Sequence, residues 1–544
     1  MKIFILIFIY TLIFNIKGLS QTEDLSVKIS VENLKRHIEI LANDSLEGRG
    51  TGQKGGESAA KYLANEFEKL KLRKAGNLSS YYQYIPMHGS IPQLTSELVL
   101  YSGEKQNHLT LYEDYLLYKS GAQTFIPVAL ELVFVGYGII ALEFDYNDYQ
   151  SVDVKGKIVV FLEGEPYSTD EDYFDAERPT IYSYPESKQR IAISRGAGGS
   201  ILIPDLKYKT WEKLVREFSF EDVTLAYSVS GNLSLLINPS MADDLFKNSG
   251  YTLEDIYKMR SSNSITGFPL KAKLSFKGEF KERDFLSPNI VGMISGSDPE
   301  LKDSYLIISA HYDHLGIGPP VKGDSVYNGA FDNAIGDAAL LEIARIFVNK
   351  EVHPKRSIIF LLLTGEEKGL LGSIFYTANP VVPLYKTIAN VNIDGIALFD
   401  IFKSIIGIGK EYSTLEEYLE KAAKENNLII SSIPPLFERS ESFYRSDHAA
   451  FAAAGIPSIL IVDGIDYKNL SREEALKRFI NYSENVYHSP FDDLNQPMNF
   501  NAAVQHIDFI YDFCNELANS NETPEWKQGS PFINARLRSI AEKK

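Results

Sequence analysis

The second half of the chain alternates continuously apolar runs with amphipathic segments, and this alternation restricts the fold more than any other feature. Apolar runs of five to seven residues with few polar interruptions are typical of strands that are buried on both faces of a sheet. Segments in which apolar residues recur at helical spacing follow several of these runs. The pattern therefore predicts an α/β domain whose sheet is covered by helices on both faces. The predicted strands are 305–309, 357–363, 389–393 and 458–462, and the predicted helices are 334–348, 415–426 and 502–518.

Two regions of different character precede this domain. Residues from about 31 to 72 have the apolar spacing of two amphipathic helices, joined by a glycine-rich connection around 48–56. That connection lacks the strand and the lysine of a phosphate-binding loop, so a plain turn is expected. From about 90 to 281 the chain changes to short β-rich runs and contains no cluster of histidine and acidic residues. This stretch is predicted to be a separate β-rich module, with strands near 130–136, 158–162, 200–203 and 235–237.

Composition indicates a folded globular protein and argues against one class of partner. Of the 544 residues, 44% are hydrophobic and 23% are charged, and the formal net charge is −17. A uniformly acidic protein binds phosphate poorly, so nucleic acid is not expected as a partner. The single cysteine, Cys514, excludes an intramolecular disulfide and a thiolate metal cluster. Its apolar surroundings predict a small buried side chain.

The first twenty residues are typical of a cleavable secretory signal. Lys2 precedes an apolar run at 3–14, and small residues follow at Gly18 and Ser20. The apolar run is shorter than the roughly 20 residues that a membrane-spanning helix needs. We therefore predict cleavage after Ser20 and an exported product, periplasmic or secreted, without stable membrane association after cleavage.

Histidine and acidic residues recur where the predicted strands end. Taken singly, a His-x-Asp, a Glu-Glu or an Asp-Gly is usually a solvated pair or a turn. In open α/β sheets, however, ligands bind in the crevice at the carboxyl ends of the strands, and several of these residues fall there together. The candidate residues are His311, Asp313, Asp332, Glu366, Glu367, Asp394 and His488.

These side chains form a ligand set of nitrogen and oxygen atoms without sulfur. Zinc accepts such a set, as do cobalt and manganese, and composition alone does not choose among them. The adjacent carboxylates of Glu366 and Glu367 would repel each other at an isolated site. A bound dication removes that penalty for one glutamate and leaves the other free to act as a base.

The same segments resemble the co-catalytic dizinc aminopeptidase family, the zinc-dependent exopeptidases of clan MH. The resemblance is carried by Ser-Ala-His-Tyr-Asp-His-Leu-Gly at 309–316, Gly-Ala-Phe-Asp-Asn-Ala-Ile-Gly at 329–336 and Thr-Gly-Glu-Glu-Lys-Gly-Leu-Leu-Gly-Ser at 364–373. Shorter matches continue in the same order at 392–394, 445–448, 455–457 and 487–490, and the resemblance covers about 284–520 plus 46–49. It implies a central mixed β-sheet flanked by helices, the phosphorylase/hydrolase-like zinc peptidase fold.

The β-rich module resembles a protease-associated (PA) domain. The similar segments are Phe-Val-Gly-Tyr-Gly at 134–138, Asp-Val-Lys-Gly-Lys-Ile-Val-Val at 153–160 and Gly-Ala-Gly-Gly at 196–199. Both resemblances together imply a peptidase domain that is interrupted by a PA-like insertion. The predicted organisation is a signal peptide at 1–20, the N-terminal part of the peptidase domain at 21–95, the PA-like domain at 96–283, the zinc peptidase catalytic domain at 284–520 and a C-terminal tail at 521–544.

The family pattern assigns five residues of this sequence to two zinc ions. His311 and Asp394 correspond to ligands of one zinc, and Glu367 and His488 to ligands of the other. Asp332 corresponds to the carboxylate that bridges them. Cobalt or manganese could replace zinc in such a set.

Three further residues are implied in catalysis. Glu366 corresponds to the general base, and Asp313 to the carboxylate that orients a histidine ligand. Tyr487 is our candidate for holding the developing oxyanion. The sequence departs from the family pattern at Phe331 and Ile335, which are not ligand positions, so these departures bear on the shape of the pocket.

The resemblance implies an exported dizinc metallo-aminopeptidase that acts on peptides with a free N-terminus, through a metal-bridging hydroxide and the base Glu366. The alternatives are glutaminyl-peptide cyclotransferase-like chemistry, carboxypeptidase activity on the same fold, or a binding protein that keeps only the fold. The complete ligand set favours two metals and hydrolysis over a one-zinc cyclase. The presence of Glu366 beside Glu367 argues against a binding protein. Side-chain preference and oligomeric state stay open.

Overall fold

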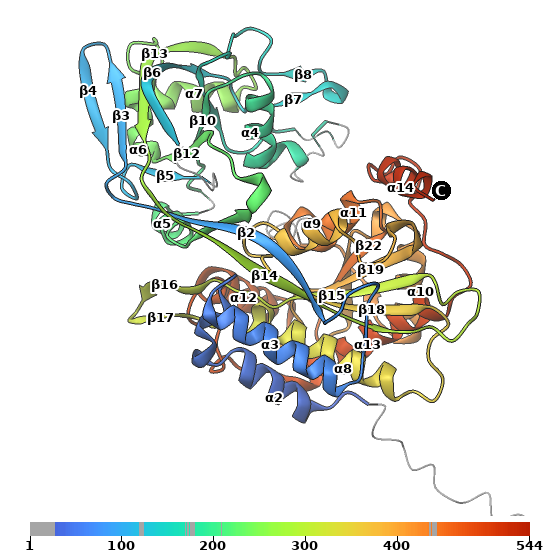
Figure 1. Ribbon diagram of the computed structural model, residues 1–544. Helices are drawn as coiled ribbons and strands as arrows, with labels where there is room; N and C mark the ends of the chain where they lie inside the picture. The colour runs from blue at the N-terminus through green and yellow to red at the C-terminus, as the bar shows by residue number, and fades with distance from the viewer. Residues whose placement is uncertain are drawn as a thin grey trace, which may run out of the picture.

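The computed structural model describes residues 28–118, 124–168, 170, 173–174, 180–207, 209–434, 437 and 443–543. The predicted signal peptide lies outside these residues. Two β-sheets, each packed against helices, form a larger and a smaller part of the molecule (Figure 1). None of the described helices is long and apolar enough to cross a bilayer.

The larger part is built on a ten-stranded mixed sheet. Its central strands run parallel, and its flanks pair antiparallel on both sides. This arrangement confirms the predicted mixed sheet, and all four predicted strands are present. The order is β11 (Asp222–Leu225), β2 (Tyr82–Pro92), β14 (Phe280–Ile294), β18 (Ser357–Leu363), β15 (Tyr305–His311), β19 (Thr387–Ile393), β22 (Ser458–Asp463), β20 (Ser404–Ile408) and β21 (Ile429–Ile430), with β1 (Arg73–Lys74) paired to β14.

Helices cover both faces of this sheet because its central strands are apolar on both faces. In β18, Ile358, Phe360 and Leu362 join the core under one layer of helices, whereas the alternate residues Ile359 and Leu361 join a second core on the other face. Such alternation follows from the two-residue period of a strand. One layer contains α2 (Val31–Leu41), α3 (Lys54–Lys69), α8 (Ile335–Asn349) and α13 (Phe500–Asn519), and the other contains α9 (Leu371–Ala378) and α11 (His448–Ala453). The predicted helices 334–348, 415–426 and 502–518 correspond to α8, α10 (Leu415–Glu425) and α13.

The connection between α2 and α3 is more than the plain turn expected from its glycines. It contains the short helical turn η3 (Asp44–Arg49), in which Gly48 has a φ of 65°. A Cβ on Gly48 would lie 2.2 Å from the carbonyl oxygen of Tyr327, so no other residue fits there without movement. The next residue, Arg49, is completely buried.

The smaller part contains the predicted strands but also helices that the sequence pattern did not predict. Its sheet order is β4 (Lys105–Leu109), β3 (Glu97–Ser102), β13 (Phe268–Lys277), β6 (Phe125–Phe134), β9 (Ile158–Leu162), β10 (Gly199–Ile203), β12 (Leu233–Ile237) and β5 (Tyr115–Leu117). The parallel strands β6, β9, β10 and β12 lie at its centre. Parallel pairs need crossover connections, and here α4 (Pro185–Ser194) connects β9 to β10 while α5 (Trp211–Phe218) lies between β10 and β12. Two further helices, α6 (Pro239–Phe246) and α7 (Leu253–Ser261), lie between β12 and β13.

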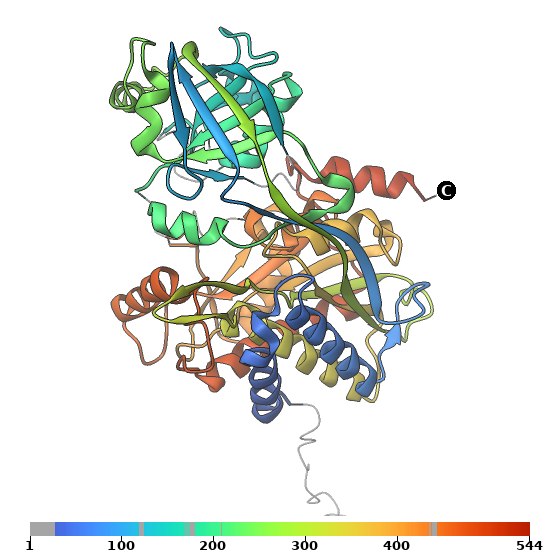
Figure 2. The same ribbon diagram turned by 60° about the vertical axis from the view of Figure 1, so that its left-hand side comes forward.

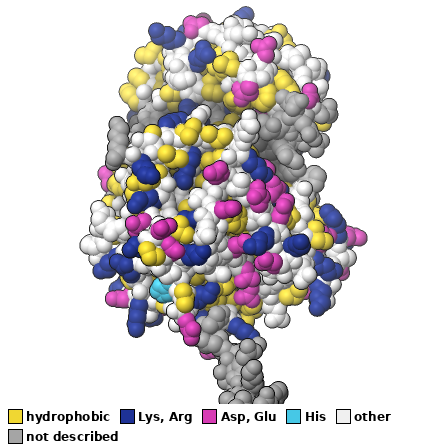
Figure 3. All heavy atoms as spheres, turned by 90° about the vertical axis from the view of Figure 1, so that its right-hand side faces the viewer, with side chains coloured by type: hydrophobic (Ala, Val, Ile, Leu, Met, Phe, Trp, Pro, Cys, Tyr) yellow, Lys and Arg dark blue, Asp and Glu magenta, His cyan; other side chains and the backbone are white. Residues whose placement is uncertain are grey.

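Two long strands, β2 and β14, connect the two parts. They pair antiparallel from Tyr82–Ile290 to Pro92–Phe280 and run together toward the smaller part (Figure 2). The segment 96–283 is not confined to the smaller sheet, because β11 lies within it and pairs with β2 in the larger sheet. On the face shown in Figure 3, basic and acidic side chains are interspersed over both parts.

The last residues are packed against the larger part rather than forming a plain tail. Helix α14 (Ile533–Ala541) follows a segment in which the Trp526 indole donates to the Gly455 carbonyl. Arg536 donates to the carbonyls of Leu384 and Thr387. Cys514 is buried in α13, as predicted. The remaining elements include α12 (Arg472–Asn481) and the hairpins β16 (Gly316–Val321) with β17 (Asp324–Tyr327) and β7 (Ile140–Ala141) with β8 (Tyr146–Asn147).

Candidate metal centre

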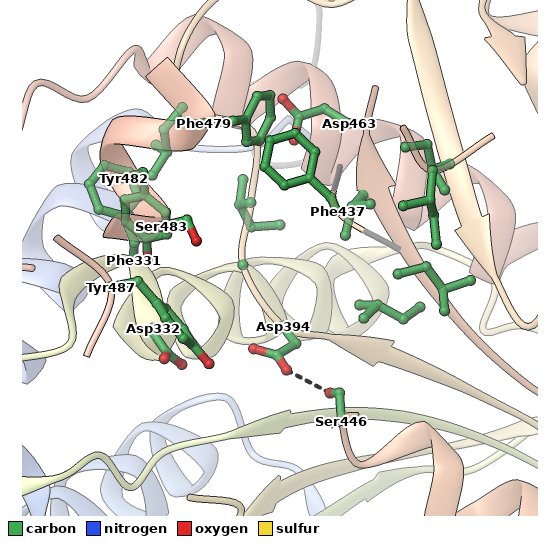
Figure 4. A pocket seen from close by; sticks show the side chains of 18 of the residues that line it. Phe331, Asp332, Asp394, Phe437, Ser446, Asp463, Phe479, Tyr482, Ser483 and Tyr487 are labelled. Carbon is green, nitrogen blue, oxygen red and sulfur yellow. Dashed lines mark hydrogen bonds between the residues drawn. The ribbon is translucent and has the colours of Figure 1, made fainter. Parts of the chain in front are cut away.

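The candidate ligands come together at the carboxyl ends of the central strands. His311 is the last residue of β15, Asp394 follows β19, and Glu367 follows β18. Asp332 lies in the turn η7 (Ala330–Ala334) before α8, and His488 follows the turn η12 (Tyr482–Val486). Figure 4 shows Asp332 and Asp394 at one end of a pocket. Residues that are up to 177 positions apart in the sequence thus meet at one edge of the sheet.

The two oxygens of Asp332 face two different histidines. His311 Nε2 lies 3.2 Å from Asp332 Oδ1 and 3.2 Å from Asp394 Oδ1. On the other side, His488 Nε2 lies 3.2 Å from Asp332 Oδ2 and 3.1 Å from Glu367 Oε2. Asp332 therefore belongs to two groups of ligands at once, one on each side.

These distances fit a pair of bound metal ions. Two ligand atoms at about 2.0–2.1 Å from a tetrahedral zinc lie roughly 3.3 Å from each other, and the four separations here are 3.1–3.2 Å. In addition, His488 Nε2 is buried and has no hydrogen-bond partner among the described residues, although it faces two carboxylate oxygens. The geometry therefore accommodates one metal ion on each side of Asp332, while the roles of the individual ligands stay predictions.

His314, which the sequence analysis left without a role, also belongs to this centre. Its Nδ1 lies 2.6 Å from Glu367 Oε1 and 3.9 Å from Asp332 Oδ2, and the side chain is buried. His314, Asp332 and Glu367 could by themselves hold a metal ion. However, 2.6 Å is a hydrogen-bond length, shorter than the separation of two ligands on one ion. His314 therefore orients Glu367, and the spacing favours His488 as the ligand.

Asp313 acts on a different partner from the one expected. Its carboxylate lies 4.0 Å from His311 Nδ1, too far for a hydrogen bond, and the Asp313 backbone carbonyl accepts from that nitrogen instead, at 3.1 Å. Donation by Nδ1–H leaves the lone pair on Nε2 free for a metal. The carboxylate accepts from the Thr51 hydroxyl at 2.8 Å and from the Glu366 amide at 3.1 Å. Asp313 thus positions the loop of the two glutamates.

A chain of buried hydrogen bonds leads from the sheet to Asp394. Asn390 Nδ2 donates to Ser309 Oγ at 2.9 Å, and Ser309 donates to Asn392 Oδ1 at 2.6 Å. Asn392 Nδ2 donates to Ser446 Oγ at 2.8 Å, and Ser446 donates to Asp394 Oδ2 at 2.6 Å. The oxygen of Asp394 that does not face His311 is therefore fixed, as metal ligands usually require.

Two other buried residues hold the loops of the site, and sequence reasoning missed both. The Asp492 carboxylate accepts from the amides of Phe331 and Asp332, at 2.9 and 3.0 Å. The Arg49 guanidinium donates to four backbone carbonyls. A single arginine or aspartate in a polar loop has no periodicity that would reveal such a role. The short match at 46–49 was the one available signal for Arg49.

The two adjacent glutamates occupy opposite electrostatic environments. Burial raises the pKa of Glu366 well above its usual value, and the neighbouring carboxylates Asp394 and Glu367 add to this effect. Burial also opposes the ionisation of Glu367, but His488 and His314 hold its pKa below the usual value. Two carboxyls with separated pKa values can divide the roles of proton acceptor and permanent anion.

Tyr487 lies beside the ligands, in the wall of the pocket. Its ring stacks on His488, with centroids 3.8 Å apart, and burial raises its pKa well above the usual value. Phe331, one of the two departures from the family pattern, packs edge-on against Tyr482 at 5.5 Å and lines the same pocket. The structure therefore places Tyr487 near the ligands, while its role as an oxyanion donor stays a prediction.

Comparisons with known proteins give a consistent result. Residues 289–513 match the model of the protein family described as "Peptidase family M28". The chain is similar to a "Probable zinc metalloprotease" of Pyricularia oryzae, 34% identical over 120 residues, which are 22% of each chain. It is also similar to "Aminopeptidase NAALADL1" of Mus musculus, 36% identical over 114 residues, which are 20% of this chain and 13% of the relative. The matched segments thus span less than a quarter of these relatives.

A solved structure supports the fold along most of the chain. The aminopeptidase from Aneurinibacillus sp. strain AM-1 superposes with a TM-score of 0.53 and 17% identity, over 92% of this chain and 96% of that one. At this identity the likeness establishes the architecture.

Proposed function

We propose that this chain, whose residues 289–513 match peptidase family M28, is an exported dizinc aminopeptidase. The observation that carries the proposal is Asp332, whose two oxygens each lie 3.2 Å from a histidine nitrogen on opposite sides. The names of two relatives, a probable zinc metalloprotease and an aminopeptidase, support the same activity. Export rests on the predicted signal at 1–20.

The five ligands would hold one metal ion on each side of Asp332. His311 and Asp394 would bind one zinc, and Glu367 and His488 the other, while cobalt or manganese could occupy the same sites. Bound zinc would polarise the scissile carbonyl and make the attacking water more acidic.

Glu366 is the residue proposed to move protons. Its carboxylate would take a proton from the attacking water and pass it to the nitrogen of the leaving amine. The Asp313 carboxylate fixes the Glu366 amide, so the loop that carries the base is anchored. Burial keeps the pKa of Tyr487 high, so its hydroxyl stays protonated and could donate to the developing oxyanion.

The surroundings of the site favour the end of a peptide chain. Asp332, Glu366 and Asp394 line one end of the pocket, and we propose that carboxylates and a zinc ion together hold the α-amine of a free N-terminus there. The smaller part, which we propose to be a PA-like domain at 96–283, reaches the same region. Phe220 packs on Tyr327 with centroids 4.9 Å apart, and the Lys213 ammonium donates to the Glu484 carbonyl.

A comparison of blocked and free substrates tests this function. Peptides with a free N-terminus, an acetylated N-terminus or an amidated C-terminus would be incubated with the enzyme before and after chelation, and the metal content would be measured. We expect two zinc ions per chain, release of N-terminal residues from free and amidated peptides alone, and loss of activity that added zinc reverses. Cleavage of the acetylated peptide, or release from the C-terminus, would contradict an aminopeptidase. A single zinc with cyclisation of N-terminal glutamine would favour the cyclotransferase alternative.

A further inference from the structure

The pocket beside the metal centre extends well beyond the ligands. It encloses about 260 Å³, and Asp332, Glu366 and Asp394 lie at one end of it. Figure 4 shows the pocket continuing away from Asp332 and Asp394. Its walls are mainly aliphatic and come from β20, β22 and the segment after β19: Ile396, Leu398, Ile406, Ile408, Leu460 and Val462.

The far end of this pocket contains a carboxylate. Asp463, the last residue of β22, lines the pocket and accepts a hydrogen bond from the Tyr467 hydroxyl. Among the described residues, no lysine or arginine forms an ion pair with it. Burial raises the pKa of Asp463 to about 6, so the carboxylate is mainly ionised at neutral pH.

Aromatic rings accompany Asp463 at this end. Phe437 and Phe479 line the pocket with centroids 5.9 Å apart, and Figure 4 shows both beside Asp463, on the side away from Asp332 and Asp394. Phe399 packs edge-on against Phe479 at 5.0 Å. A carboxylate together with ring faces is the combination that attracts an ammonium or guanidinium group.

A purely apolar side chain would complement only part of this pocket. It would match the aliphatic walls but would leave the charge of Asp463 with the Tyr467 hydroxyl and no cation, and a carboxylate without a counter-charge in apolar surroundings is costly. A lysine or arginine side chain matches both features, because its methylene stem packs on aliphatic surface while its head group carries the charge.

We propose that this pocket selects lysine or arginine as the residue released from the peptide N-terminus. The stem lies along the aliphatic walls, and Asp463 with the rings of Phe437 and Phe479 binds the cationic head group. This inference rests on the proposed aminopeptidase function and specifies its substrate class.

The test compares p-nitroanilides of lysine, arginine, norleucine and leucine with the wild type and with Asp463→Asn. Norleucine has the unbranched stem of lysine without the ammonium group. We expect kcat/KM for lysine and arginine to exceed that for norleucine by at least about tenfold in the wild type. Asp463→Asn keeps an acceptor for Tyr467, and it should lower kcat/KM for both cationic substrates by at least about tenfold while leaving norleucine within about twofold.

Controls separate a specific effect from a general one. Asp466→Asn removes a nearby carboxylate that is 41% exposed and paired at 3.7 Å with Arg472, and it should change no substrate preference. Asp463→Glu retains the charge and should retain a preference for the cationic substrates over norleucine. The zinc content of every variant should equal that of the wild type.

The outcomes distinguish this inference from the function on which it rests. Should the wild type hydrolyse norleucine or leucine as well as lysine, the inference is wrong while the aminopeptidase stands, and this comparison needs no variant to fold. Equal loss for all four substrates in Asp463→Asn would also overturn it. Absence of hydrolysis with every aminoacyl substrate would refute the proposed function, and the inference with it.

Discussion

Replacing Arg49 by lysine should weaken metal binding and lower the stability of the fold, although the hydrogen bonds of Arg49 go to backbone carbonyls and not to the side chains of the proposed ligands. Arg49 is fully buried, and its guanidinium donates through Nε to Tyr312 O at 2.8 Å and through Nη2 to Gly329 O at 2.8 Å. Nη1 donates to the carbonyls of Leu41 and Asn328. Three of these carbonyls belong to the two loops that carry His311 and Asp332.

The size of the effect follows from the number of carbonyls that lose a donor. Lysine has three donors on one nitrogen, whereas arginine reaches its four carbonyls from three nitrogens in a rigid fork. We expect two carbonyls to be left without a donor in Arg49→Lys, each at a cost of about 1–3 kcal/mol. The free energy of unfolding should therefore fall by about 2–6 kcal/mol, a large part of the 5–15 kcal/mol that is typical of a folded domain.

Urea unfolding followed by fluorescence, together with the zinc content of the folded protein, measures both consequences. The midpoint should fall for Arg49→Lys, and zinc should be lost more readily on dilution, because the loops of His311 and Asp332 are less well held. Arg472→Lys is the matched control, since Arg472 is 66% exposed and pairs with Asp466 at 3.7 Å; its effect should stay below about 1 kcal/mol. If Arg49→Lys proves as stable as this control, the argument from carbonyl satisfaction is refuted.

Three more predictions concern the site and the fold. Glu366→Gln should lower kcat by at least roughly 10²–10⁴-fold with both metals retained, whereas Glu367→Gln should lose metal and recover part of its activity at high zinc. Measuring kcat of both variants over a zinc titration distinguishes the two roles. A near-normal kcat in Glu366→Gln would exclude Glu366 as the base. Asp332→Ala should lose both zinc ions by elemental analysis, and retention of two would exclude the bridge. Burial lowers the pKa of His37 to about 4, so between pH 6.5 and 4 unfolding takes up a proton and stability should fall with pH, by about 3 kcal/mol in total. Urea midpoints across this window should depend less on pH in His37→Gln, and an unchanged dependence would contradict the assignment.

Local patterns were sufficient to predict the four central parallel strands of the larger sheet, β15, β18, β19 and β22, but not the strands that flank them. The run 357–363 corresponds to β18 residue for residue, and every position of that strand is buried. A continuously apolar run of this length is typical of a strand that is covered on both faces. The helices of the smaller part were harder to predict: α5, α6 and α7 have only eight, eight and nine residues, and in α4 the apolar residues are not concentrated on one side.

The candidate ligands could be proposed from the sequence because their residue types and their positions at strand ends carry information. His311 and Asp394 each close an apolar run, and in a parallel sheet such ends meet at one edge. His488 was recognised by its motif, since no regular pattern precedes it. The division of roles between Glu366 and Glu367 came from the family pattern, and the structure adds the different neighbours of the two carboxyls.

The supports of the site were decided by tertiary structure alone. Arg49 and Tyr312 are 263 residues apart, and Asp492 is 160 residues from Asp332. Likewise, the Asp313 carboxylate accepts from the Glu366 amide at 3.1 Å but lies 4.0 Å from His311 Nδ1. A difference of about 1 Å in side-chain position therefore determines which residue it binds. A sequence records which residues prefer burial and which backbone conformations they favour, because these are local properties. A hydrogen bond between distant loops exists only after the sheet has brought them together, so it leaves no periodic trace in the chain.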